Sequence, residues 1–124
     1  MKITFTDREA DVMQVLWENG ASTVADVRAL LSDKLAYTTV LSILRILETK
    51  GYVRHQQDGR GYRYVAGVEQ QDAQTSALRH LLRKFFKGSS ELLFTRLVSE
   101  RKLSQEEIRR MRKLLTAMSR EDGR

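Results

Sequence analysis

Apolar residues recur at every third or fourth position through the first 50 residues, which is the spacing of one buried face of an α-helix. Three runs with this spacing follow one another, separated by short polar segments. Their apolar positions are Ala10, Val12, Met13, Val15, Leu16 and Trp17, then Val24, Val27, Leu30 and Leu31, then Val40, Ile43, Leu44 and Leu47. The pattern therefore predicts three consecutive amphipathic helices.

Polar residues mark where the first two helices begin and end. Thr6 and Glu9 have the spacing of a capping box, in which each side chain bonds the backbone amide of the other residue. Thr23 and Asp26 repeat this spacing before the second run. Gly20 follows the first run, and glycine is common just after a helix because it adopts the left-handed conformation easily.

After the third helix, which is expected over residues 37–50, the pattern becomes typical of strands. Residues 52–56 and 62–65 are rich in aromatic and β-branched side chains, and Asp58-Gly59 between them favours a tight hairpin turn. Three helices and a hairpin in this order are the layout of a winged helix-turn-helix. The aromatic residues expected to pack its core are Trp17, Tyr52, Tyr62 and Tyr64.

Helical spacing returns after the hairpin and continues almost to the end of the chain. Gly88 and the capping box that begins at Ser104 divide this part into three amphipathic helices. The predicted fold is therefore mainly α with one small β-hairpin. A winged-helix domain is expected over residues 1–70 and a three-helix dimerisation domain over residues 71–124.

The three C-terminal helices are expected to pair with a second copy of the chain. Three short helices alone bury too little surface to offset the loss of chain entropy, and two-fold homodimers are the commonest solution. The alternative is that the helices fold back on their own N-terminal domain. The predicted dimerisation residues are Leu78, Leu81, Leu82, Phe85, Phe86, Leu93, Leu97, Ile108, Met111 and Leu115.

Charge is distributed unevenly along the 124 residues, whose formal net charge is +6. Residues 1–33 hold three basic and six acidic residues, whereas residues 34–63 hold six basic and two acidic ones. The basic stretch coincides with the third helix and the hairpin, which favours a polyanionic partner for these two elements.

Several classes of protein are disfavoured by composition. The chain has no cysteine and two histidines, so no metal site or other cofactor is expected. No phosphate-binding glycine loop and no nucleophile–base arrangement is present, so an enzyme is not expected. The absence of a signal-peptide pattern and of a long apolar run predicts a cytoplasmic protein without membrane insertion.

The third helix and the hairpin carry the candidate residues for binding double-stranded DNA, since the third helix of this fold enters the major groove. These residues are Thr38, Thr39, Ser42, Arg45, Lys50, Arg54, Arg60 and Arg63. Other roles are open for some of them: Thr38 could cap its helix, Arg45 could be solvated, and Arg54 or Arg63 could only flank the sheet.

Several blocks of sequence recur in one known family. They are Thr6-x-x-Glu9, Val12-Met13, Leu16-Trp17, Thr23-Val24-x-x-Val27, Tyr37-Thr38-Thr39-Val40-x-Ser42-x-Leu44-x-x-Leu47-x-x-Lys50-Gly51, Gly59-Arg60-x-Tyr62-x-Tyr64, Lys87-Gly88 and Leu103-Ser104-Gln105-Glu106-Glu107-Ile108. Together they resemble the penicillinase-repressor family, which includes the BlaI and MecI repressors of β-lactam resistance.

This resemblance implies a homodimeric transcriptional repressor that binds a palindromic operator, with an N-terminal winged helix and C-terminal dimerisation helices. It implies that Thr38, Thr39, Ser42 and Arg45 face the operator and that Arg60 lies on the wing. Family members controlled by a membrane sensor-protease are cut at an Asn-Phe bond in the dimerisation domain. Arg96-Leu97 stands at the matching position and is the candidate cleavage position.

Two other functions remain open from the sequence. The chain could be a winged-helix module that binds proteins and not DNA, since residues 1–33 are acidic. It could also be a repressor of the same fold that a small molecule induces. In the copper-responsive relatives a C-terminal cysteine motif binds the inducer, and this chain has no cysteine.

Overall fold

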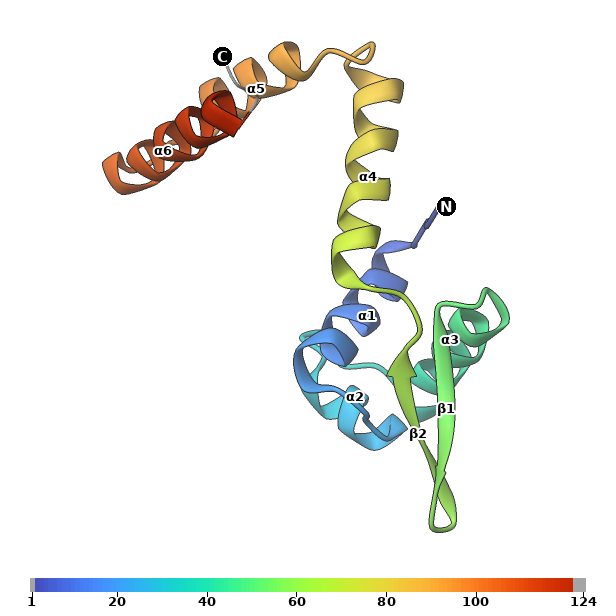
Figure 1. Cartoon of the computed structure of the whole chain (residues 1–124). Coiled ribbons are helices and arrows are strands. Elements are labelled where there is room, and N and C mark those ends of the chain that lie inside the picture. Colours follow the sequence, from blue (N-terminus) through green and yellow to red (C-terminus); the bar gives the residue numbers. More distant parts are fainter. Residues whose placement is uncertain (1, 122–124) are drawn as a thin grey trace. The chain divides into compact units, whose positions relative to one another are not determined.

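The computed structural model describes residues 2–121, which form six helices and one two-stranded sheet (Figure 1). The chain divides into two compact units, Met1–His80 and Leu81–Arg124. The elements in chain order are α1 (Asp7–Asn19), α2 (Val24–Leu30), α3 (Tyr37–Thr49), β1 (Val53–Asp58), β2 (Gly61–Ala66), α4 (Gln70–Phe85), α5 (Ser90–Glu100) and α6 (Gln105–Glu121).

Both predicted capping boxes of the first unit are confirmed. The amide of Thr6 donates to Glu9 Oε1 at 2.8 Å, and the amide of Glu9 donates to Thr6 Oγ1 at 3.2 Å. Thr23 and Asp26 make the same pair of bonds before α2, at 3.1 and 3.0 Å. These local bonds satisfy amides that have no partner within the helix, and they therefore define where α1 and α2 begin.

The hairpin is a regular antiparallel pair that extends from Val53↔Ala66 to Asp58↔Gly61. This register leaves a two-residue loop, and Gly59 at its first position has a φ of 63°, a conformation that glycine adopts without steric cost. Ser22 adds a short bridge to Tyr64 on the outer side of β2. The predicted winged-helix layout is confirmed.

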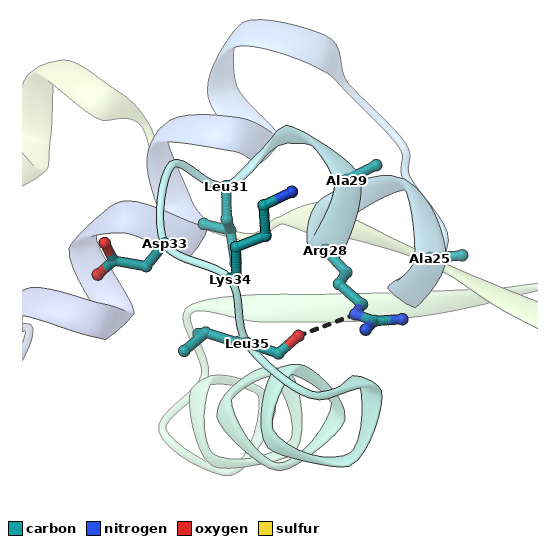
Figure 2. A pocket seen from close by; sticks show the side chains of 7 residues that line it. All are labelled: Ala25, Arg28, Ala29, Leu31, Asp33, Lys34 and Leu35. Atoms are coloured by element: carbon teal, nitrogen blue, oxygen red, sulfur yellow. Dashed lines mark hydrogen bonds between the residues drawn. The ribbon is translucent and has the colours of Figure 1, made fainter.

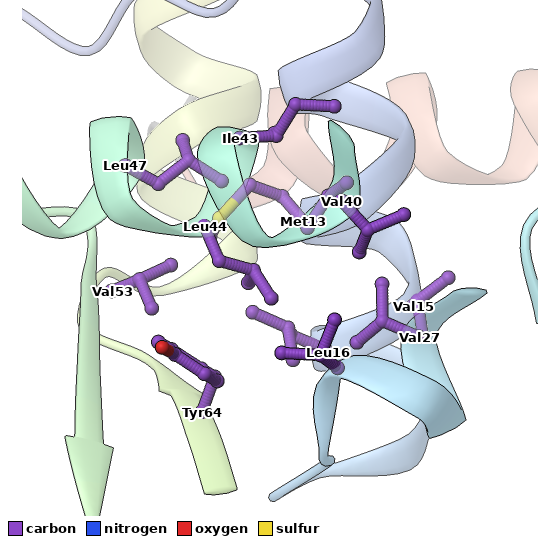
Figure 3. Packing of buried hydrophobic residues seen from close by; sticks show 12 residues of the cluster. Met13, Val15, Leu16, Val27, Val40, Ile43, Leu44, Leu47, Val53 and Tyr64 are labelled. Atoms are coloured by element: carbon purple, nitrogen blue, oxygen red, sulfur yellow. The ribbon is translucent and has the colours of Figure 1, made fainter. Parts of the chain in front are cut away.

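Side chains from α1, α2, α3 and the hairpin meet in one core (Figure 3). The largest fully buried side chains in it are Met13, Leu16, Leu44, Leu47, Val12, Val27, Val40 and Val53. Trp17 packs against this core and donates from Nε1 to the carbonyl of Val68 at 2.9 Å. Because α3 contributes four buried residues, its orientation is set by the core.

One aromatic residue does not pack as the sequence predicts. Tyr64 is 4% exposed, and Trp17 and Tyr52 are half-buried against the core, but Tyr62 is 51% exposed. Tyr62 lies one step closer to the loop than Tyr64 on the same strand face, where the hairpin has already passed the edge of the core.

The first half of α4 belongs to the N-terminal unit. Ala73 is buried, and Ser76 Oγ bonds both the amide and the carbonyl of Ile3, at 2.8 and 3.1 Å. A functional division of the chain after residue 70 stays a prediction.

The C-terminal unit contains the end of α4 and the whole of α5 and α6. Ser89 caps α5 through the amide of Leu92 at 3.0 Å, and Ser104 forms the predicted capping box with Glu107. Neither α5 nor α6 contains a buried residue. Within residues 2–121, no helix combines the length and apolar character that a membrane span requires.

Candidate nucleic-acid interface

The outward face of α3 is polar and exposed. Thr38, Thr39, Ser42 and Arg45 all lie on it, on the side of the helix opposite the buried residues Val40 and Leu44. The N-cap is Ala36, whose side chain makes no capping bond. Thr38 is the second residue of α3 and does not cap it, and the start of this helix can attract an anion because its first amides lack a side-chain acceptor.

The turn before α3 is held by a side chain from α2. Arg28 Nε donates to the carbonyl of Leu35 at 2.8 Å (Figure 2). This bond borders a pocket of about 270 Å³ lined by Ala25, Arg28, Ala29, Leu31, Asp33, Lys34 and Leu35. Arg28 therefore helps to fix the position at which α3 begins.

The β1–β2 hairpin, which is the wing of this fold, carries two exposed arginines. Arg60 is exposed in the two-residue loop, and Arg54 is exposed on β1. His55, on the other face of β1, bonds Glu48 of α3 through Nδ1. The ring of Tyr62 meets the ring of His55 edge-on, with centroids 4.6 Å apart. The Glu48–His55 pair thus connects the wing directly to α3.

Arg63 is occupied within the protein. Its Nε donates to Asp58 Oδ2 at 2.6 Å, and its Nη1 lies 3.6 Å from Asp26 Oδ2 and donates to the carbonyl of Ala21 at 3.3 Å. The pKa of Asp26 is lowered, first by the hydrogen bond from the backbone amide of Thr23 and further by Arg63. Arg63 therefore ties the wing to the start of α2.

Lys50 is also occupied. Its Nζ lies 2.8 Å from Oε2 and 3.0 Å from Oε1 of Glu9, whose side chain is only 6% exposed. Burial alone would raise the pKa of Glu9, but the bonds from Lys50 and Thr6 outweigh burial and hold this pKa below its usual value. The pair joins the end of α3 to the start of α1.

None of the predicted dimerisation residues is fully buried. Leu78, Leu81, Phe85, Leu97 and Leu115 are exposed, and Leu82, Phe86, Leu93, Ile108 and Met111 are half-buried. Outside the predicted set, further large apolar side chains of α5 and α6 are exposed: Leu92, Phe94, Val98, Leu114 and Met118. Arg96 and Leu97, the candidate cleavage position, are exposed within α5.

A model of the penicillinase repressor family matches residues 5–117. The chain belongs to this family. Its members are DNA-binding transcriptional repressors and not enzymes, as the sequence predicts.

Individual relatives agree with this assignment. The chain is 25% identical to the penicillinase repressor of Bacillus licheniformis over 112 residues, which cover 89% of this chain and 88% of the relative. It is 23% identical to the methicillin resistance regulatory protein MecI of Staphylococcus aureus (strain N315) over 109 residues, covering 86% and 89%.

The fold also matches solved structures. A MarR family protein from Bacillus stearothermophilus aligns with a TM-score of 0.53 and 20% identity, covering 98% of this chain and 78% of that protein. The reduced form of MarR from E. coli aligns with a TM-score of 0.52 and 20% identity, covering 92% and 77%. At this identity the likeness concerns the fold alone.

Several features around α3 and the hairpin were not predicted from the sequence. Lys50 and Arg63 pair with Glu9 and Asp26, which lie far away in the chain. The Glu48–His55 pair joins residues only seven positions apart, across the turn between α3 and β1. The excess of basic residues over residues 34–63 does not indicate which basic side chains form ion pairs within the protein. Ile46 on α3 is 50% exposed and was not predicted to be. Its position in the helical repeat, away from the buried residues of α3, indicates this exposure.

Proposed function

We propose that the protein represses transcription as a homodimer that binds a palindromic operator. Each protomer inserts the outward face of α3 into the major groove of one half-site, while the wing follows the adjacent backbone. The observation that carries this proposal is the exposed polar face of α3, with an uncapped N-terminus, beside a wing whose loop presents Arg60.

The residues have separate tasks in this arrangement. Thr38, Thr39, Ser42 and Arg45 contact base edges and nearby phosphates, because short hydroxyls and a guanidinium reach both. Arg54 and Arg60 add phosphate contacts from the wing. Lys50 and Arg63 act mainly by holding α3 and the wing in place, and a phosphate contact by either of them stays a prediction.

The second copy of the chain covers the apolar side chains of the C-terminal helices. The helices α5 and α6 have no buried residue, and exposed Leu, Phe, Val and Met side chains recur along them. Contiguous exposed apolar surface of this kind marks an interaction site. A pair with two-fold symmetry presents two α3 helices, which explains why the operator would be palindromic.

The regulated genes and the inducing signal follow from the relatives as proposals. Because the relatives include a penicillinase repressor and a methicillin resistance regulator, genes of β-lactam resistance are the first candidates. Induction through a membrane sensor-protease would require cleavage near Arg96-Leu97. Incubation of the dimer with membranes that contain such a sensor tests this step, and an intact chain after β-lactam exposure would exclude it.

The experiment that tests the proposal is selection of duplexes from a random pool, followed by titration of the best palindrome at several salt concentrations. If each protomer neutralises four phosphates, the slope of log affinity against log salt is about −7 for the dimer. Ser42→Ala should change base preference. Failure to enrich any palindrome would favour a protein-binding module.

A further inference from the structure

The outward face of α3 contains one apolar side chain among polar ones. Ile46 is 50% exposed and does not belong to the core or to the residues packed against it. It lies one helical turn beyond Ser42, next to Arg45 and on the side of α3 that faces away from the core. About half of the surface of this side chain therefore stays open to solvent in the described part of the chain.

The neighbouring Thr49 makes the site more apolar than its sequence suggests. Its hydroxyl Oγ1 donates to the carbonyl of Arg45 at 3.0 Å, so this hydrogen is turned back on the helix. Base edges approaching the third turn of α3 would therefore meet the Ile46 side chain and the guanidinium of Arg45 before any free hydroxyl donor.

The position of Ile46 along the helix is compatible with the groove. The helix rises about 12 Å between Thr38 and Ile46, and the major groove of B-DNA is about 12 Å wide. A helix that contacts one edge of the groove with Thr38 can therefore keep Ile46 inside the same groove. The apolar group that base pairs present there is the C5-methyl of thymine.

We propose that Ile46 is a specificity-determining residue that packs on the methyl group of a thymine in each operator half-site. This proposal rests on the proposed function, since it requires α3 to lie in the major groove. In this proposal the exposed side chain of Ile46 contacts DNA and not a protein partner. Removing a methyl group from the contact should weaken binding about fourfold for each half-site.

The test replaces thymines one at a time with deoxyuridine, which lacks only the methyl group. The probe is the best palindromic duplex recovered by selection, substituted symmetrically in both half-sites. We expect one thymine position at which the wild-type protein loses about 15-fold in affinity. Ile46→Ala should bind the unmodified duplex more weakly and lose its sensitivity at that position, while Ile46→Val should keep part of it.

Matched variants separate this role from others. Ser42→Ala, one turn away, should keep the sensitivity to deoxyuridine, and Leu30→Ala removes a similarly exposed leucine from α2 without an effect on DNA binding. The proposal is overturned if no thymine methyl contributes, or if Ile46→Ala keeps the same sensitivity. If Ile46→Ala changed the oligomeric state of the DNA-free protein, as measured by sedimentation velocity, the side chain would instead belong to a protein contact. Failure of the wild type to bind any palindrome would reject the proposed function itself.

Discussion

The two units of the chain differ in how far each one buries its own apolar residues. In the N-terminal unit, eight large side chains are less than 2% exposed, and they come from three helices and the hairpin. In the C-terminal unit, α5 and α6 contain no buried residue at all. Both regions have amphipathic helices with capping bonds, so helix amphipathicity and capping do not explain the difference in burial.

The difference separates a unit that encloses its own core from one that leaves its apolar side chains exposed. The winged helix is complete as a monomer, because its hairpin and helices enclose a core that positions α3. In α5 and α6 the large apolar side chains are exposed, and we propose that a second copy of the chain covers them. The first unit would then supply recognition, and the second would supply the spacing and the affinity that two half-sites give together.

The largest effect is expected when a side chain in the core of the N-terminal unit is shortened. Leu44→Ala should lower the free energy of unfolding by about 2–5 kcal/mol, because Leu44 is fully buried and its removal leaves a cavity. Urea denaturation followed by the fluorescence of Trp17 measures this change. The control Leu30→Ala, at an exposed position, should change stability by less than about 0.5 kcal/mol. Equal effects of the two variants would argue against the core described above.

The proposed pairing of the C-terminal unit with a second copy is tested by placing a charge on the apolar face of α6. Leu115→Glu should produce a monomer and weaken operator binding about 100-fold or more, since two linked half-site contacts become independent. Sedimentation velocity and fluorescence anisotropy measure the two effects. Lys113→Glu introduces the same carboxylate on the polar side of α6 and should leave the dimer intact. A dimeric Leu115→Glu protein would place the interface elsewhere.

The ion pair between α1 and α3 predicts a pH dependence that belongs to the first unit alone. Because the pKa of Glu9 is lowered in the folded state, its stabilising contribution is complete above the unfolded value of 4.5 and is lost as pH falls through the lower folded value. The free energy of unfolding should therefore decrease less steeply from pH 6 to pH 3 in Glu9→Gln than in the wild type.

Removing the other partner of this pair gives a complementary result. Lys50→Met should destabilise the protein by about 1–3 kcal/mol at pH 7, because the nearly buried carboxylate of Glu9 loses its charged donor. The loss should shrink at low pH, where Glu9 is protonated. A pH-independent loss would mean that Lys50 acts through packing of its aliphatic chain.

The smallest expected effect concerns the wing. Arg60→Ala removes an exposed side chain and should leave stability unchanged, while operator affinity falls less than tenfold on all sequences alike. The salt slope should become shallower by about 2 for the dimer, one phosphate for each protomer. Titrations at four salt concentrations measure this slope. An unchanged slope would place the wing loop away from the backbone.

The sequence predicted the parts of the fold that depend on local bonds. The capping boxes at Thr6, Thr23 and Ser104 and the hairpin loop at Gly59 involve neighbours within three residues, so their spacing is visible in the chain. The burial of Tyr62 was predicted wrongly, because it depends on how far the hairpin projects beyond the core.

The ion pair between Lys50 and Glu9 could not be predicted from the sequence for a related reason. Lys50 meets Glu9 across 41 positions of the chain, and no local pattern relates the two. The outward face of α3 was predictable, since Thr38, Ser42 and Arg45 follow the helical repeat. Which bases they contact depends on DNA geometry that the chain does not encode locally.

The most direct measurement compares the affinity of the full chain for the selected palindrome with its affinity for a duplex that carries a single half-site. If the C-terminal helices join two winged helices, two chains occupy the palindrome, and the single half-site is bound more weakly by about 100-fold or more. Equal affinities with one chain on each duplex would contradict the proposed division of labour between the two units.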